Sequence, residues 1–257
     1  MITLDGLSVA LPPGRIVRAK EGDGRPAFWL SDGPLPPRMW ATLRADHPRS
    51  GLWPLLLTAL DPHDEFRPWG DGDVDPDAMT SPASHDVDAV LAHWWAGQQP
   101  VDGSESDVIA PYGTSWPGRS PRLEPSTDPD ATAAELVEVL ASFDDDTRFG
   151  LVPAERGADA ITSAGWLGPV NHTGDTAKLS AVLRDWEDRF GARLIGAGFA
   201  TLQVSVAAPP GSREEALSVA AEHFAFCPDN VWQGPEGTLA GYAERLVGED
   251  TWYFWWD

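Results

Sequence analysis

The residues best suited to chemistry lie close together around position 225. His223 and Cys227 are four positions apart on a predicted helix, so their side chains can touch. An imidazole beside a thiol can lower the pKa of that thiol and produce a thiolate nucleophile. Cys227 also continues an apolar stripe of the same helix, formed by Leu217, Ala220 and Phe224, which is typical of a cysteine that only packs.

The same stretch could supply ligands to a metal ion. His223, Cys227 and Asp229 would need a fourth ligand from elsewhere, and their spacing matches no zinc-binding pattern. The chain has no phosphate-binding loop, dinucleotide-binding glycine motif, nucleophile elbow or His-Glu-x-x-His sequence. We therefore expect no metal and no cofactor, and no motif identifies a catalytic residue.

A second group of polar residues surrounds the aromatic end of the sequence. If Asp257 is the last residue, it carries both a side-chain and a terminal carboxylate, next to the indoles of Trp255 and Trp256. These groups together could hold a cationic group by charge and cation–π attraction. Alternatively, Glu222 and Asp257 pair with Arg189 or Arg193 and only close the fold. The candidate pocket comprises Glu222, His223, Cys227, Asp229, Gln233, Trp255, Trp256 and Asp257.

The charge of the chain limits its partners. The formal net charge is −22, from 18 basic and 40 acidic residues. Residues 1–60 are net +2, residues 61–150 net −16 and residues 151–257 net −8. Such a field repels phosphate, so we expect neither nucleic acid nor an anionic membrane as a partner. A basic protein or a cationic small molecule would be attracted, unless the charge serves solubility alone.

The sequence also indicates a location. Met1 is not followed by the basic and apolar regions of a secretory signal, and no apolar stretch approaches the length that spans a bilayer. The single cysteine excludes an internal disulfide. We expect a cytoplasmic protein.

The predicted elements become clear after residue 149. The pattern indicates a strand at 149–152, a short helix at 158–164, a long amphipathic helix at 175–190 and a hairpin at 193–207. Ser212 and Glu215 have capping-box spacing before a helix that reaches residue 226, and Thr238 begins a last helix. The closing Trp252–Asp257 is aromatic on both faces, so we expect this strand to be covered on both sides or to roof a pocket.

Three segments resemble a known bacterial family, the actinobacterial domain of unknown function four-two-five-three. They are Leu183-Arg184-Asp185-Trp186-Glu187-Asp188-Arg189-Phe190-Gly191-Ala192, Ala221-Glu222-His223-Phe224-Ala225-Phe226-Cys227-Pro228-Asp229 and Trp252-Tyr253-Phe254-Trp255-Trp256-Asp257. The resemblance covers residues 149–257 and implies a C-terminal domain at 146–257 after an N-terminal region at 1–145. It implies no activity, substrate or cofactor.

The N-terminal region is less regular. Short strands are expected at 7–11, 16–19 and 27–30, a helix at 39–45 and a buried strand at 52–57. Residues 61–84 have the composition of a linker or surface loop, and 98–125 is a further loop. Two helices are expected, one capped by Ser84 and ending at Gly97, the other following Asp128.

The fold class that follows is α+β (mixed α/β). A small mixed sheet flanked by helices would form the C-terminal domain, after an irregular β-rich N-terminal part. The favoured function is a protein- or ligand-binding module, in one form an immunity-like protein that neutralises a basic partner. The alternatives are a hydrolase-type enzyme that uses Glu222, Asp229 or Cys227, and a structural accessory domain.

Overall fold

One mixed sheet of seven strands forms the centre of the molecule. The computed structural model describes residues 2–4, 6–61, 65–98, 107–143 and 146–257. The strand order is β1-β2-β4-β3-β5-β6-β7, with β3 and β5 parallel and every other pair antiparallel. The strands are β1 (Gly14–Arg18), β2 (Pro26–Ser31), β3 (Leu52–Leu57), β4 (Arg148–Pro153), β5 (Ala192–Ala197), β6 (Thr201–Val206) and β7 (Thr251–Trp255).

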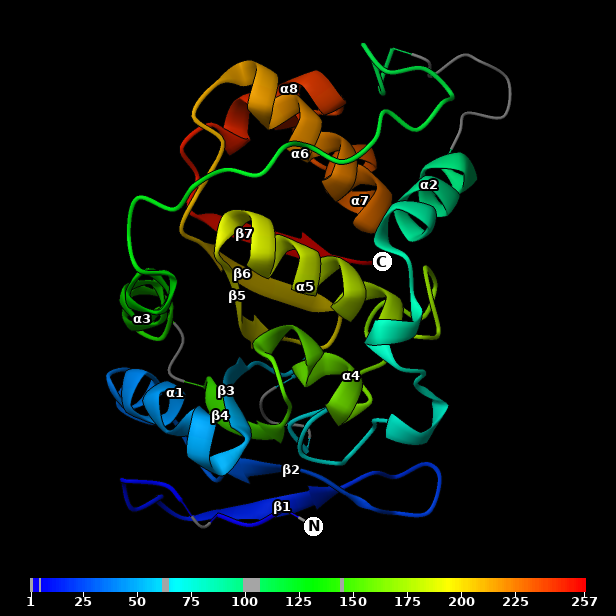
Figure 1. Cartoon of the computed structure of the whole chain (residues 1–257). Coiled ribbons are helices and arrows are strands. Elements are labelled where there is room, and N and C mark those ends of the chain that lie inside the picture. Colours follow the sequence, from blue (N-terminus) through cyan, green and yellow to red (C-terminus); the bar gives the residue numbers. More distant parts are fainter. Residues whose placement is uncertain (1, 5, 62–64, 99–106, 144–145) are drawn as a thin grey trace.

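The helices cover this sheet and gather at its β7 end. In Figure 1, α5 crosses in front of β5 and β6, α1 and α3 lie at one side, and α6, α7 and α8 lie beyond β7. The helices are α1 (Met39–Ser50), α2 (Val87–Gly97), α3 (Pro129–Leu140), α4 (Ala160–Ala164), α5 (Ala177–Phe190), α6 (Arg213–Phe226), α7 (Asp229–Trp232) and α8 (Leu239–Leu246), with single 3₁₀ turns η1 (Pro76–Ala78), η2 (Pro82–Ser84) and η3 (Gly157–Asp159). None of the described helices is long and apolar enough to cross a membrane.

The α+β fold and the predicted C-terminal elements are confirmed. Gly191 ends α5 with a left-handed backbone (φ 62°), which a glycine adopts without strain. Ser212 caps α6 by accepting a hydrogen bond from the Glu215 backbone N–H, and Thr238 caps α8 in the same way through Gly241. The local signals of these helices were therefore sufficient to place them.

Several N-terminal predictions are wrong. Residues 7–11 form no strand, whereas the helix predicted at 39–45 is confirmed as α1 and extends to Ser50. The α2 cap is Asp86, whose side chain accepts from the Ala89 N–H, rather than Ser84. The described part of 61–84 is no linker, because Phe66, Trp69 and Val74 are buried in the core.

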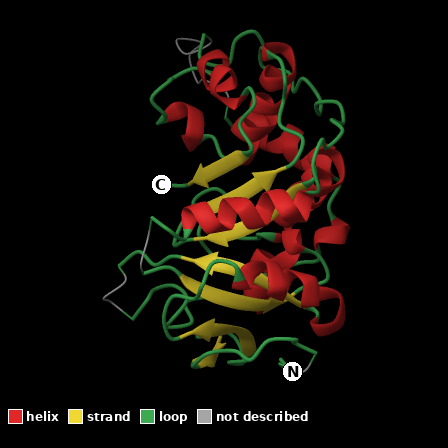
Figure 2. Cartoon of the chain, turned by 90° about the vertical axis from the view of Figure 1, so that its left-hand side faces the viewer, coloured by secondary structure: helices red, strands yellow, loops and turns green. Residues whose placement is uncertain are grey.

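The two halves of the sequence share the sheet. Strand β4 comes after residue 145 but lies between β2 and β3, which both come before it. It pairs with β3 along six positions, from Leu52↔Pro153 to Leu57↔Arg148. Figure 2 shows the strands stacked as one continuous sheet from the N-terminal end to the closing helices. The division into domains at residue 145 stays a prediction.

The closing strand β7 lies at the edge of this sheet, against β6. Trp252, Phe254 and Trp256 face inward, where the Phe254 ring stacks on Trp186 of α5 with ring centroids 5.5 Å apart. Tyr253 and Trp255 face the other way and are more exposed. One aromatic face of β7 is therefore core, and the other is open to a pocket.

Candidate functional site

Side chains from the end of α6 and from α7 cover the free edge of β7. Asn230 Nδ2 donates to the Tyr253 carbonyl (2.7 Å), and Asn230 Oδ1 accepts from the Trp255 N–H (3.3 Å). The Cys227 thiol donates to the Trp255 carbonyl (2.9 Å), and Asp229 Oδ2 accepts from the Asp257 N–H (3.1 Å). These side chains take the place of a neighbouring strand and hold the aromatic end of the chain in position.

Cys227 and His223 lie inside the core. Burial raises the pKa of the Cys227 thiol well above its ordinary value, which disfavours a thiolate. Burial also lowers the pKa of His223 well below its ordinary value, so the imidazole is neutral. The Tyr242 hydroxyl lies 3.0 Å from His223 Nδ1 and accepts from Asn230 Nδ2, so its own hydrogen is available to the imidazole. Neither side chain lines an open pocket.

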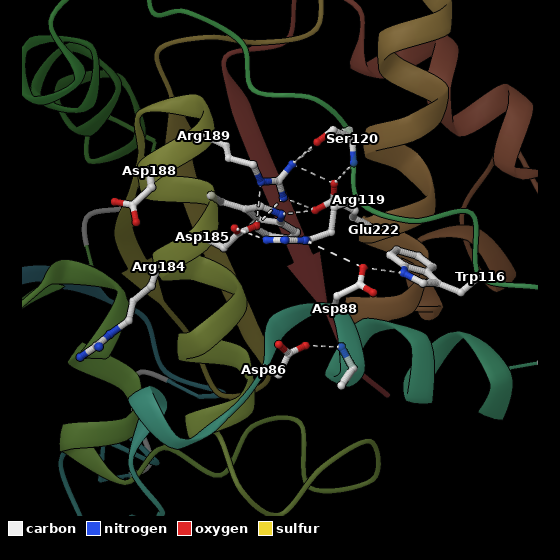
Figure 3. Close-up of polar contacts among 12 residues, drawn as sticks. Asp86, Asp88, Trp116, Arg119, Ser120, Arg184, Asp185, Asp188, Arg189 and Glu222 are labelled. Carbon is white, nitrogen blue, oxygen red and sulfur yellow. Dashed lines mark hydrogen bonds and ion pairs between the residues drawn. The ribbon is translucent and has the colours of Figure 1, made fainter.

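Glu222 is fully buried in a polar network beneath the segment 107–128 (Figure 3). Its Oε1 accepts from the Ser120 N–H (2.7 Å) and from Arg189 Nη1 (3.0 Å). Its Oε2 accepts from Arg189 Nη2 (2.5 Å) and from the Trp186 indole (2.8 Å). Of the two alternatives for Glu222, the structure therefore shows the pairing with Arg189.

A pocket of about 560 Å³ opens beside the outward face of β7. The residues that line it come from the end of β3, the loop after α4, the β5–β6 turn and β7. They are Thr58, Ala59, Leu60, Gly168, Val170, Asn171, Phe199, Ala200, Thr201, Tyr253, Trp255, Trp256 and Asp257. We call this space the β7 pocket. Its volume lies within the usual range of small-molecule sites, about 300–1,000 Å³.

Three of the predicted site residues line the β7 pocket, namely Trp255, Trp256 and Asp257. Asp229 and Gln233 adjoin it through Asp257, since Gln233 Nε2 donates to Asp229 Oδ1 (3.0 Å) while Asp229 Oδ2 accepts from Asp257. Glu222, His223 and Cys227 do not line it.

Sequence reasoning missed most of the pocket wall. Phe199 and Val170 lie in loops, and the available sequence signal for Phe199 was an aromatic residue directly after a glycine in the turn of the predicted hairpin. Tyr253 shares a strand face with Trp255, so the alternation along β7 did contain that signal.

The polar part of the β7 pocket has acidic and neutral groups. A Cβ on Gly198 would lie 2.3 Å from Thr201 Oγ1 and 2.8 Å from Thr58 Oγ1, so only glycine lets these two hydroxyls approach the turn. Asn171 Nδ2 donates to the Asp257 carbonyl (2.8 Å) and ties the loop after α4 to the end of the chain. Among the described residues that line the pocket there is no lysine or arginine, and Asp257 is the acidic one.

No metal site emerges from the described part of the chain. It contains no group of three or more His, Cys, Asp or Glu side chains arranged to hold a metal ion. His223 forms a hydrogen bond with Tyr242, and Cys227 forms one with the backbone of β7. Asp229 accepts hydrogen bonds from Gln233 and from the Asp257 N–H. The polar chemistry of this region is therefore hydrogen bonding and charge.

Comparison with known proteins identifies one relationship. Residues 148–257 match the model of a family described as a domain of unknown function (DUF4253). No curated protein and no solved structure matches the chain. The matched segment begins at β4 and ends with the aromatic strand β7 and Asp257. The segment that carries Cys227, Asp229 and most of the β7 pocket thus matches the DUF4253 family model, while the N-terminal part of the chain lies outside the match.

Proposed function

We propose that this protein is a binding module that docks on a basic partner and neutralises it, with the β7 pocket as its contact site. The single observation that carries the proposal is the apolar rim of this pocket. Of the eight exposed large apolar side chains among the described residues, three surround it: Leu60 (63 % exposed), Val170 (61 %) and Tyr253 (46 %). Exposed apolar groups gathered around one concave site mark an interaction surface.

Charge supports a cationic group as the occupant. The pocket combines the aromatic rings of Tyr253, Trp255 and Phe199 with the side chain of Asp257. Aromatic faces and a carboxylate together attract an ammonium or guanidinium group, by roughly 0.5–2 kcal/mol for the cation–π contact alone. The net charge of −22 adds long-range attraction for a basic partner.

Other features fit this role. We place the protein in the cytoplasm, where thiols stay reduced, and the free, buried thiol of Cys227 is consistent with that location. We do not extend the proposal to hydrolysis, because Glu222 and Cys227 lie in the core with their polar atoms engaged in hydrogen bonds.

The test is a titration with N-acetyl-arginine amide and with its uncharged isostere, N-acetyl-citrulline amide. We expect the arginine probe to bind in the millimolar range and to shift the indole N–H resonance of Trp255, while the citrulline probe binds at least about threefold more weakly. Asp257→Asn and Trp255→Leu should each weaken the arginine probe about threefold to tenfold.

A matched control removes one exposed negative charge elsewhere. Glu135 lies exposed on α3, outside the pocket, so Glu135→Gln changes the net charge as Asp257→Asn does and should leave affinity unchanged. Equal binding of the two probes, or equal weakening by both charge variants, would contradict a cation site at the β7 pocket.

A further inference from the structure

A second, smaller pocket continues from the β7 pocket. It measures about 220 Å³ and is lined by Arg67, Pro68, Asp73, Leu167, Gly168, Val170 and Phe199. Gly168, Val170 and Phe199 line both pockets, so the two hollows lie on either side of one shared wall. We call the smaller one the Leu167 pocket.

The Leu167 pocket suits an apolar group. Pro68, Leu167, Val170 and Phe199 form its apolar lining. The Arg67 guanidinium lies over the Phe199 ring (5.1 Å to the centroid) and pairs with Asp73 (2.7 Å), so its charge is compensated. An apolar side chain placed there would bury its surface without displacing an unpaired charge.

The edge of β7 excludes one mode of peptide binding. A peptide can add to an exposed strand through its backbone, but on this edge Asn230, Cys227 and Asp229 already bind the Tyr253 carbonyl, both backbone groups of Trp255 and the Asp257 N–H. A partner segment in this groove must therefore be recognised by its side chains. In an extended chain, side chains at i and i+2 point to the same face about 6.5–7 Å apart, so two such side chains can enter two neighbouring pockets.

Resting on the proposed function, we infer that the two pockets read an extended segment of the basic partner. A lysine or arginine side chain enters the β7 pocket beside Asp257, and an apolar side chain two positions away enters the Leu167 pocket. The basic residue supplies charge complementarity, and the apolar residue selects among the many basic segments that a partner presents.

The test compares capped pentapeptides in calorimetry against the full chain. Ac-Gly-Arg-Gly-Gly-Gly-amide is the reference, and Ac-Gly-Arg-Gly-Leu-Gly-amide and Ac-Gly-Leu-Gly-Arg-Gly-amide carry leucine two positions from arginine in the two directions. We expect one of the two leucine peptides to bind about tenfold tighter than the reference. Ac-Gly-Arg-Leu-Gly-Gly-amide, with adjacent side chains on opposite faces, should gain little.

Variants of the pocket residues show where the affinity gained from leucine arises. Leu167→Ser should remove the advantage of leucine while leaving the affinity of the reference peptide unchanged, whereas Phe199→Ala should weaken both peptides because its ring lines both pockets. Val247→Ser, at an exposed apolar residue outside both pockets, is the control and should change neither. Each variant is first checked for a wild-type thermal melt.

The outcomes separate the two proposals. If the reference peptide does not bind, the cation site fails and the inference fails with it. If the reference binds but no leucine peptide gains, or if the gain survives Leu167→Ser, the two-pocket inference alone is overturned. Binding of free arginine amide as tight as that of the best peptide would likewise overturn it, since the site would then serve a small cation.

Discussion

One side chain of α7, Asn230, supports the free edge of β7. Asn230 forms hydrogen bonds with the Tyr253 carbonyl, the Trp255 N–H and the Tyr242 hydroxyl, and it is 4 % exposed. An aliphatic residue at this position would leave the Tyr253 carbonyl and the Trp255 N–H, whose bonds to Asn230 are partly buried, without these partners. Each such group costs about 1–3 kcal/mol.

We therefore expect Asn230→Ala to lower the free energy of unfolding by about 2–4 kcal/mol. Gln233→Ala is the matched control at the end of α7, because Gln233 is exposed and its side chain makes one described hydrogen bond, to Asp229. It should cost less than about 1 kcal/mol. Urea unfolding followed by near-UV circular dichroism measures both, and equal losses would show that Asn230 does not support the strand edge.

His172 should make stability depend on pH. Burial lowers its pKa from 6.5 to about 4, its ring packs on Trp94 (4.8 Å between centroids) and its Nε2 is buried without a partner. As pH falls below 6.5 the unfolded chain binds a proton that folded His172 does not, so stability falls until about pH 4 and the effect then levels off.

The urea midpoint between pH 7 and pH 4.5 should therefore fall less steeply in His172→Phe than in the wild type. His93→Gln, which removes an exposed histidine, is the comparison for loss of any histidine. An unchanged slope in His172→Phe would mean that this imidazole is protonated in the folded protein.

Elements were predictable where their signals are local. The Asp128 cap, the Ser212 cap and Gly191 lie within a turn of the helix ends that they determine, and all three perform those roles. The placement of β4 between β2 and β3 depends on pairings between residues 91 to 122 positions apart in sequence, which no local pattern encodes. The β7 pocket could not be predicted for the same reason, because Leu60, Val170 and Phe199 in its wall come from three separate loops.

The segment 107–128 is an element without regular structure that is held by charge. Arg119 pairs with Asp185 (2.7 Å), and the Ser120 carbonyl and hydroxyl accept from Arg189 while its N–H donates to Glu222 (Figure 3). Removal of one partner from a buried ion pair strands the other charge and typically costs about 3–5 kcal/mol.

Glu222→Gln should lower stability by less than that amount, because Arg189 keeps its ion pair with Asp185, and it should loosen this segment. Trypsin should then cut after Arg119 or Arg122 faster than in the wild type under native conditions. Asp188→Asn removes an exposed acid that lies on α5, the helix of Arg189, and pairs with Arg156; it should leave both stability and cleavage nearly unchanged. Unchanged cleavage in Glu222→Gln would show that the segment does not depend on this carboxylate.

At the scale of the molecule, the family segment and the preceding region form one sheet. Both neighbours of β4 and the parallel neighbour of β5 are strands from residues before 145. The contact extends to side chains, because the Trp53 indole of β3 donates to the Leu194 carbonyl of β5 (2.9 Å). The Leu60 wall of the β7 pocket likewise comes from outside the family segment.

Residues 146–257 expressed alone should therefore fail to unfold cooperatively, since β4 would lose both of its partners and the apolar faces they cover. Mixing with a separate fragment of residues 1–143 should restore a single transition and the near-UV signal of the buried tryptophans, because the shared sheet can reassemble from two chains. A cooperative melt of 146–257 alone, unaltered by the second fragment, would instead show that these residues form an independent domain. The N-terminal strands would then not be needed for its folding. In the expected case the binding pocket exists only when both halves are present, so cation binding should return together with the restored transition.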